Sequence, residues 1–234
     1  MFSKYISKDT GPSPLAIMVY LIAVVIAASI VFTFLGTFLA SLIFDVGYKE
    51  LSAMQLEGDR PALVNAFKFL QVFISVGLFI LPPVLVALFL KEKPVSYLGM
   101  REVPSGVFAS QVTLLFIISI PFLQWLVEWN MQLQLPGSLE GVENWMKNRE
   151  DSVNKMIEAF LFDGTLRGLA INLFVVALVP AITEEIFFRG LIQKLLQKWL
   201  ISPHWAIILT AILFSAFHMQ FYGFVPRLFL GIVI

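Results

Sequence analysis

Long apolar stretches without a single charge alternate with short charged segments along the chain. The first three stretches are Leu15–Phe44, Phe69–Leu90 and Ser105–Val127. As a helix rising roughly 1.5 Å per residue, each can cross the roughly 30 Å hydrocarbon core of a bilayer. Pro82 and Pro83 are expected to kink the second stretch, because proline removes a helix hydrogen bond. The pattern therefore predicts three membrane-spanning helices.

A polar stretch from Glu128 to Arg167 follows the third span and contains many acidic residues. We interpret it as a loop that contains a surface helix near Val142–Phe162. Trp129 and Trp145 are expected at the depth of the membrane interface, where the amphipathic indole ring is favoured. We therefore divide the chain into residues 1–165, with about three spans and this loop, and residues 166–234, with the candidate chemistry.

Two further spans and a short apolar run are predicted after the loop. The fourth span begins near Gly168 and stays uncharged as far as Thr183. The fifth runs from about Trp205 to Val225, where Pro226-Arg227 is expected to break it. A sixth run, Leu228–Ile234, is too short to cross a bilayer, so we expect the chain to stop before its last helices.

The composition also indicates a membrane protein. Apolar residues make up 59% of the 234 residues and charged residues 14%, against roughly 45–50% and about 25% in soluble chains. A soluble globule cannot hide so much apolar surface, which excludes a soluble enzyme. The formal net charge is zero and cysteine is absent, which argues against nucleic-acid binding, disulfides and thiolate chemistry. We predict an all-α, polytopic transmembrane helix bundle.

The basic residues favour a cytoplasmic N-terminus. With the N-terminus inside, eight basic residues fall on the inner side and six on the outer side, and an excess of Lys and Arg marks the cytoplasmic side. No organelle-targeting signal is evident, so we expect a bacterial plasma membrane. The inner group is Lys4, Lys8, Lys91, Lys93, Arg101, Arg189, Lys194 and Lys198; the outer group is Lys49, Arg60, Lys147, Arg149, Lys155 and Arg167.

Three ionisable residues, Glu184, Glu185 and Arg189, lie within the fourth span. Charged groups at that depth are costly, so they are candidates for function. Glu185 and Arg189 are four residues apart on one helix face, where they can form an ion pair. Glu184 is rotated by about 100° from Glu185 and has no evident partner in its own helix. This carboxyl group is a candidate general base or acid.

His218 is the ionisable residue of the fifth span. Counting back from Lys194 places Glu184 about 15 Å from the inner boundary, and counting on from Trp205 places His218 about 20 Å from it, along antiparallel helices. Neighbouring helices would therefore bring the two side chains into one hydrated cavity. A carboxylate and an imidazole can activate water directly or bind a metal that does so.

Each of these residues also has a purely structural interpretation. Adjacent glutamates near a helix end are often solvated, and a Glu–Arg pair often serves packing alone. A lone intramembrane histidine often bonds a neighbouring helix. The combination of all four residues on two successive spans, at similar depth, is what favours chemistry.

The pattern Glu184-Glu185-x-x-x-Arg189, followed by Phe214-x-x-x-His218 in the next span, resembles the CPBP intramembrane proteases. This family includes the type II CAAX prenyl endopeptidases and the Abi-like bacteriocin-processing or immunity proteins. The resemblance covers roughly Leu166 to Ile234. It implies hydrolysis of a peptide bond inside the membrane or at its edge, in a membrane-anchored peptide or protein.

The resemblance also implies a role for each motif residue. Glu184 would be the general base that activates water, and His218 would share that water or ligate a metal. Glu185 and Arg189 would shape the site through their ion pair. The family has a third motif on a later helix, a His followed four residues on by Asn or Asp, which this sequence does not contain.

Whether a metal takes part stays open in the sequence. Zn²⁺ or another divalent metal would have Glu184 and His218 as ligands, and Glu185 is the remaining eligible side chain. A closed zinc site usually needs more protein ligands than this. A mechanism that uses glutamate and histidine without metal is equally compatible with these residues.

Two other functions compete with the protease. A proton- or ion-coupled transporter would use Glu184 and His218 as a relay, but it predicts matching acids in the first three spans, which are absent. A membrane scaffold or immunity protein would bind a partner through the Trp-bearing outer loop. Besides the substrate, we expect the lipid bilayer as a partner. We expect no nucleic-acid partner.

Overall fold

The structure is a computed structural model that describes residues 11–52, 60–101, 105–133, 136–200 and 202–233. It is 85% helical, and no strand occurs in these residues. Four described helical stretches are long and apolar enough to cross a membrane: Pro14–Phe44, Pro61–Phe89, Gly106–Met131 and Leu166–Leu200. The predicted all-α membrane helix bundle is confirmed, and the protein is an integral membrane protein. Lys4, Lys8 and Ile234, used in the predictions above, lie outside the described residues.

The first span is one uninterrupted helix, α1 (Pro14–Phe44). Ser13 caps its start, because the Ser13 hydroxyl accepts a hydrogen bond from the backbone N–H of Ala16 (3.2 Å). Asp45 ends the helix in the left-handed conformation, with φ 52°. The short helix α2 (Tyr48–Ser52) follows.

The second span begins earlier than predicted. It consists of α3 (Pro61–Phe79) and α4 (Leu81–Phe89), and the break at Ile80 lies just before Pro82-Pro83, where the sequence predicts a kink. The predicted start at Phe69 is wrong, because the charge of Lys68 interrupts the apolar pattern but not the helix. Lys68 is buried, and its Nζ donates a hydrogen bond to the backbone oxygen of Phe160 (3.0 Å).

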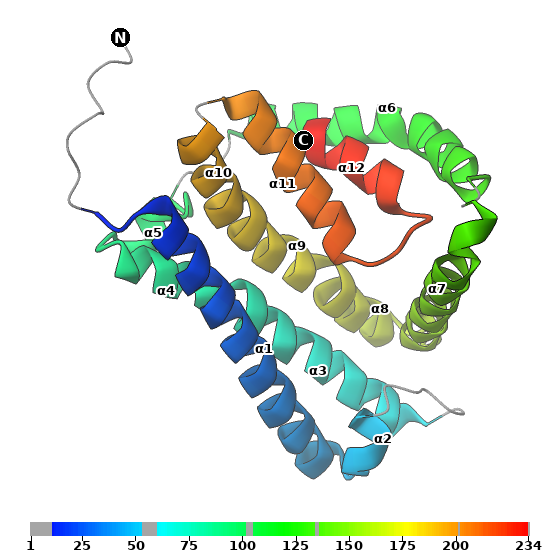
Figure 1. Ribbon diagram of the computed structural model, residues 1–234. Helices are drawn as coiled ribbons and strands as arrows, with labels where there is room; N and C mark the ends of the chain where they lie inside the picture. The colour runs from blue at the N-terminus through cyan, green and yellow to red at the C-terminus, as the bar shows by residue number, and fades with distance from the viewer. Residues whose placement is uncertain (1–10, 53–59, 102–104, 134–135, 201, 234) are drawn as a thin grey trace.

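Glycines allow α1 and α3 to pack closely side by side (Figure 1). A Cβ atom on Gly77 of α3 would fall 2.0 Å from the Phe32 ring of α1, and one on Gly36 of α1 would fall 2.9 Å from the Phe73 ring of α3. The rings of Phe32 and Phe73 are themselves in contact, with centroids 5.3 Å apart. Each helix thus offers a glycine hollow that receives a phenylalanine of the other.

The helices α6 (Gly106–Met131) and α7 (Glu140–Leu161) form one edge of the molecule (Figure 1). They follow the short helix α5 (Pro94–Tyr97) and enclose a 3₁₀ turn, η1 (Gly137–Leu139). The third span extends past the predicted end at Val127 to Met131, and α7 lies close to the predicted surface helix. Trp129 and Trp145 are both exposed, and their position at the depth of the membrane interface stays a prediction.

The fourth span is continuous from Leu166 to Leu200. Thr165 caps its start by accepting a hydrogen bond from the backbone N–H of Gly168 (3.0 Å). Two segments are wound as π-helix, and π-helical turns in α-helices are frequent at functional sites. The order is α8 (Leu166–Asn172), π-helical η2 (Leu173–Leu178), α9 (Val179–Glu184), π-helical η3 (Glu185–Ile192) and α10 (Gln193–Leu200).

The end of the chain departs from the predicted fifth and sixth runs. The helix α11 (Pro203–Phe217) ends just before His218, and α12 begins at Phe224 rather than Leu228 and extends to Val233. The predicted break at Pro226-Arg227 is wrong. Pro226 lies in the first turn of α12, where no backbone N–H is needed for an intrahelical bond.

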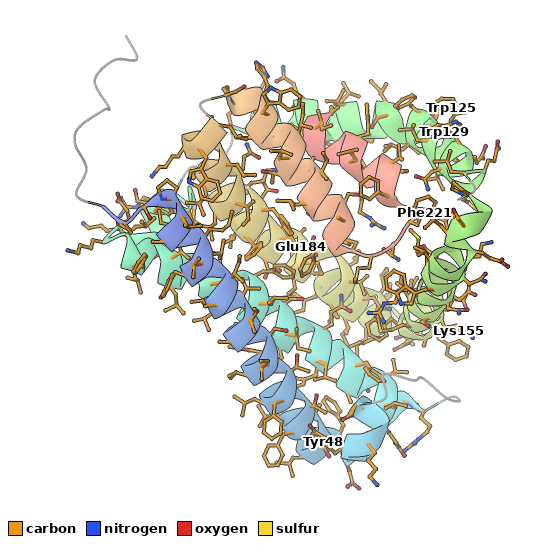
Figure 2. All side chains as sticks on the ribbon, in the orientation of Figure 1. Tyr48, Trp125, Trp129, Lys155, Glu184 and Phe221 are labelled. Carbon is orange, nitrogen blue, oxygen red and sulfur yellow. The ribbon has the colours of Figure 1, made fainter. Side chains whose placement is uncertain are left out.

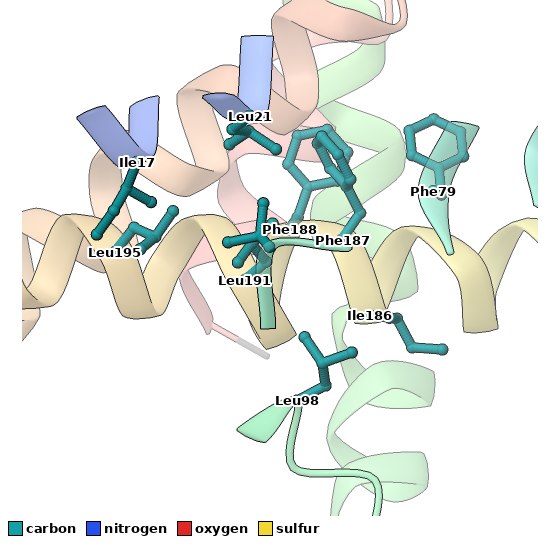
Figure 3. Close-up of a cluster of buried hydrophobic side chains, with 10 residues drawn as sticks. Ile17, Leu21, Phe79, Leu98, Ile186, Phe187, Phe188, Leu191 and Leu195 are labelled. Atoms are coloured by element: carbon teal, nitrogen blue, oxygen red, sulfur yellow. The ribbon is translucent and has the colours of Figure 1, made fainter. Parts of the chain in front are cut away.

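The fourth span is anchored by a cluster of buried apolar side chains that come from several elements (Figure 3). The edge of the Phe79 ring meets the ring of Phe187, with centroids 5.4 Å apart. Phe188 makes a similar edge contact with Phe214 of α11 (5.2 Å). The buried members are Ile17, Leu21, Phe79, Val86, Leu98, Ile186, Phe187, Phe188, Leu191 and Leu195. This packing fixes the helix that carries Glu184 against the first two spans.

Candidate active site

The structure brings Glu184 and His218 together. The Nε2 atom of His218 lies 3.8 Å from the Oε1 atom of Glu184, and the side chains are 26% and 19% exposed. Glu184 is the last residue of α9, and His218 caps the end of α11. Figure 2 shows Glu184 at the centre of the molecule, where these helices meet. The juxtaposition that residue counting predicts is therefore present.

The ring orientation of His218 is set by Phe214. The Nδ1 atom of His218 is 2.9 Å from the backbone oxygen of Phe214. A carbonyl oxygen can only accept, so Nδ1 carries the hydrogen and a neutral ring has its lone pair on Nε2, toward Glu184. The Phe214 ring also meets the imidazole edge-on, with centroids 4.8 Å apart. The spacing Phe214-x-x-x-His218 thus supplies both a backbone acceptor and an aromatic wall.

Glu185 and Arg189 form the ion pair that their spacing predicts. Arg189 Nε lies 3.6 Å from Glu185 Oε2, with Glu185 61% exposed and Arg189 28% exposed. Arg189 also donates from Nη2 to the backbone oxygen of Gly231 (3.3 Å). Arg189 therefore ties η3 to α12 and helps to close the bundle beside Glu184.

A small cavity of about 50 Å³ lies next to the two glutamates. It is large enough for a water molecule and has polar groups on its wall that can bind one. Its lining combines the acidic motif with residues of α11 and α12: Glu184, Glu185, Phe188, Arg189, Thr210, Ala211, Phe214 and Gly231.

The turn after His218 is fastened to three other parts of the molecule. Met219 adopts the left-handed conformation with φ 51°, and the chain then reverses into α12. The side-chain amide of Asn130, from α6, donates to the backbone oxygen of Phe221 (2.8 Å). Ser215 of α11 donates to the backbone oxygen of Phe224 (2.6 Å). The backbone N–H of Tyr222 donates to Glu150 of α7.

This reversal of the chain brings a cation, Arg227, close to the site. This residue was missed in the sequence analysis. Arg227 of α12 interacts electrostatically with both Glu184 and Glu150, and its Nη2 donates to Oε1 of Gln220 (2.6 Å). The signal was present in the sequence, because Arg227 is a charged residue between apolar runs. It was assigned to a helix break, whereas the same rule that singles out Glu184 applies to it.

The described side chains near Glu184 offer few ligands for a metal ion. Within the part of the chain that the structure describes, no group of three or more His, Cys, Asp or Glu side chains is placed to hold a metal ion. Glu184 and His218 are two such ligands, fewer than a structural or catalytic zinc site usually has. The described residues alone therefore do not fit a closed zinc site.

The motif-bearing part of the chain matches a known family. Residues 166–234 match the model of the family described as "Type II CAAX prenyl endopeptidase Rce1-like". The resemblance drawn from Glu184, Glu185, Arg189, Phe214 and His218 is confirmed over this Rce1-like region. No curated protein and no solved structure matches the chain.

The Rce1-like region contains all of the elements described above from α8 to α12. The description of this family names an endopeptidase of the CAAX type, which suggests a CAAX-protease-like activity for the matching region. Asn130 and Glu150, which fasten the turn after His218, come from outside this region. The site therefore depends on both parts of the chain.

Proposed function

We propose that this protein is an intramembrane endopeptidase that hydrolyses a peptide bond in a membrane-anchored peptide or protein. The approach of His218 Nε2 to within 3.8 Å of Glu184 Oε1 carries the proposal. These residues belong to the region that matches the Rce1-like family. A carboxylate and an imidazole lone pair that face each other are the groups required to bind and deprotonate a water molecule.

The reaction follows from the two side chains. A water molecule between them donates one hydrogen bond to Glu184 and a second to Nε2 of His218, which orients its oxygen. Glu184 takes a proton as this oxygen attacks the amide carbonyl carbon. The carbon–nitrogen bond then breaks as Glu184 returns the proton to the leaving nitrogen. General acid–base assistance of this kind contributes about 10²–10⁴-fold to the rate.

Glu185 and Arg189 support the site rather than the proton transfer. Their ion pair and the bond from Arg189 to Gly231 hold η3 against α12. Glu185→Gln leaves Arg189 without its carboxylate partner in an apolar surrounding, so we expect lower stability. The rate of the folded fraction should change far less than in Glu184→Gln.

The decisive experiment follows cleavage of a membrane-tethered peptide by the full-length protein in lipid vesicles. Glu184→Gln and His218→Ala should each lower kcat by about 100-fold or more, because the base or its water-orienting partner is lost. The matched controls are Glu128→Gln and His204→Ala, which alter exposed residues of the same types. Cleavage by Glu184→Gln at the wild-type rate would refute the role of Glu184 as the base, whereas a wild-type protein that does not cleave would favour a scaffold function.

Metal dependence is tested in the same assay. If Zn²⁺ or another divalent metal were used, Glu184 and His218 would be its ligands in this chain and the metal would polarise water or the substrate carbonyl. Since the described residues supply only this pair, we expect cleavage to survive a chelator. Loss of cleavage that added Zn²⁺ restores would show that another ligand completes a metal site.

We further propose a bacterial plasma membrane with the N-terminus in the cytoplasm. The absence of cysteine makes this simple to test by labelling single introduced cysteines. Ser96→Cys, in the exposed segment between α4 and α6, should react only from the cytoplasmic side. Asn148→Cys, on the exposed face of α7, should react from the opposite side.

A further inference from the structure

Arg227 is held in place but keeps a donor unused. Its Nη2 donates to Gln220, whereas its Nη1 is buried and has no hydrogen-bond partner. A Cβ atom on Gly223 would lie only 2.3 Å from Nη2. The guanidinium therefore rests directly on the backbone of the turn, and glycine at this position leaves it the necessary space.

The charge of Arg227 acts on two carboxylates without forming an ion pair with either. It interacts electrostatically with Glu150 of α7 and Glu184 of α9, yet no described ion pair joins it to them. Arg227 also shares a face of α12 with Gly231, one turn later, which lines the cavity beside Glu184. A buried donor without a partner costs roughly 1–3 kcal/mol, and a ligand acceptor would recover this cost.

The proposed hydrolysis creates the acceptor that Arg227 lacks. When water attacks the carbonyl carbon, Glu184 gains a proton and loses its negative charge, while the carbonyl oxygen becomes negative. The charge thus moves from one neighbour of Arg227 to the substrate. A fixed cation with a free N–H stabilises this transition state more than the ground state, which is the condition for faster chemistry.

We propose that Arg227 is a further catalytic residue, which donates from Nη1 to the oxyanion formed on the scissile carbonyl of the substrate. Arg227 then stabilises the oxyanion, while Glu184 and His218 act on the attacking water. No atom is transferred to or from Arg227, because it is charged before and after the step. This inference rests on the proposed peptidase function.

The test measures kcat and KM of Arg227 variants in the vesicle assay described above. Arg227→Gln should lower kcat by about 100-fold or more with little change in KM, as for other oxyanion donors. It should also weaken binding of a phosphinic peptide, which mimics the tetrahedral intermediate, by about the same factor. Arg149→Gln, which removes an exposed cation of α7, should change neither quantity.

A second variant tests the role of Arg227 even if Arg227→Gln does not fold. Gly223→Ala keeps the guanidinium in the protein but displaces it, and it should lower kcat in the same way. The double variant should show no further loss, because both changes act on one contact. Gly141→Ala, where an added methyl group meets nothing within 4 Å, is the matched control.

Three results would overturn the role of Arg227. One is a wild-type kcat in Arg227→Gln while the wild-type protein cleaves, which refutes this inference and leaves the peptidase intact. Another is a rise in KM with kcat unchanged, which would indicate that Arg227 binds the substrate equally in the ground state and the transition state. The third is a defect that disappears when the C-terminal carboxylate of the peptide is amidated, which would make Arg227 a carboxylate anchor. If the wild-type protein itself fails to cleave, the proposed function fails first.

Discussion

Asn130 of α6 bonds the backbone oxygen of Phe221 at 2.8 Å, and the link joins a side chain of the third span to the turn that follows His218. The same amide group also accepts a bond from the backbone N–H of Val225 (3.3 Å). Asn130 is fully buried. The placement of His218 and Arg227 on either side of this turn thus depends on a residue outside the Rce1-like region.

We therefore expect Asn130→Ala to damage the site from a distance. It leaves the Phe221 carbonyl and the Val225 N–H without their partner, at a cost of roughly 1–3 kcal/mol. Thermal unfolding should report this loss, and kcat for the tethered peptide should fall with it. Gln124→Ala on the exposed side of α6 is the control. Equal stability and equal kcat in the two variants would show that the turn holds its shape without Asn130.

The ring of Phe214 gives a second prediction. It meets the rings of His218 and Phe188 edge-on, with centroids 4.8 Å and 5.2 Å away. Phe214→Leu keeps the backbone oxygen that accepts from Nδ1 but removes both ring contacts, each worth about 0.5–1.5 kcal/mol. Cleavage should fall by about two- to tenfold, because the imidazole becomes less well oriented.

The control for Phe214 is the neighbouring Phe217, which is exposed and follows in the same helix. Phe217→Leu should retain more activity than Phe214→Leu. The reverse order would mean that the packing of Phe217 against Phe79, with ring centroids 5.5 Å apart, matters more for activity than the contact of Phe214 with His218.

Much of the site follows from counting along helices. The rise per residue of a helix is nearly constant, so distances from Lys194 and Trp205 were enough to place Glu184 and His218 at similar depth. The four-residue spacing of Glu185 and Arg189 likewise fixes their pairing. These are local rules, and the structure agrees with them. The catalytic roles of the residues stay predictions.

The parts that sequence did not predict depend on tertiary contacts. The reversal after His218 was missed because residues 219–223 are mostly apolar or aromatic, and the turn is held by Asn130 and Ser215 rather than by a strong local signal. Pro226 suggested a helix end, although proline suits a first turn equally well. The start of the second span was missed because the partner of Lys68, Phe160, is distant in the sequence.

The glycine hollows between α1 and α3 give a prediction about stability. Gly77→Ala would place a Cβ atom 2.0 Å from two atoms of the Phe32 ring, so the ring or the helix must move. Overpacking of this kind costs roughly 1–3 kcal/mol. The unfolding temperature should fall, and Phe32→Leu added to Gly77→Ala should restore part of the loss by removing the ring. Gly106→Ala, in open space at the start of α6, should have little effect.

Glu150 gives a prediction about pH. Burial raises the pKa of this carboxyl above its usual value of 4.5, and the charge of Arg227 and the N–H of Tyr222 only partly oppose the effect of burial. The folded protein therefore holds the proton of Glu150 to higher pH than the unfolded chain does. Its contribution to stability is complete below pH 4.5 and is lost as pH rises through the folded pKa.

Glu150→Gln removes this titration. Between pH 4 and 7, the unfolding temperature of the wild-type protein should fall relative to that of Glu150→Gln, with the two closest at the acidic end. Glu158→Gln, an exposed acid on the same helix, should follow the wild-type curve. Parallel curves for wild type and Glu150→Gln would mean that the charge of Arg227 fully compensates the burial of Glu150. A wild-type protein that gains stability relative to the variant at higher pH would show that Arg227 and Glu150 form the stronger pair, which would leave Arg227 less free to act on a substrate.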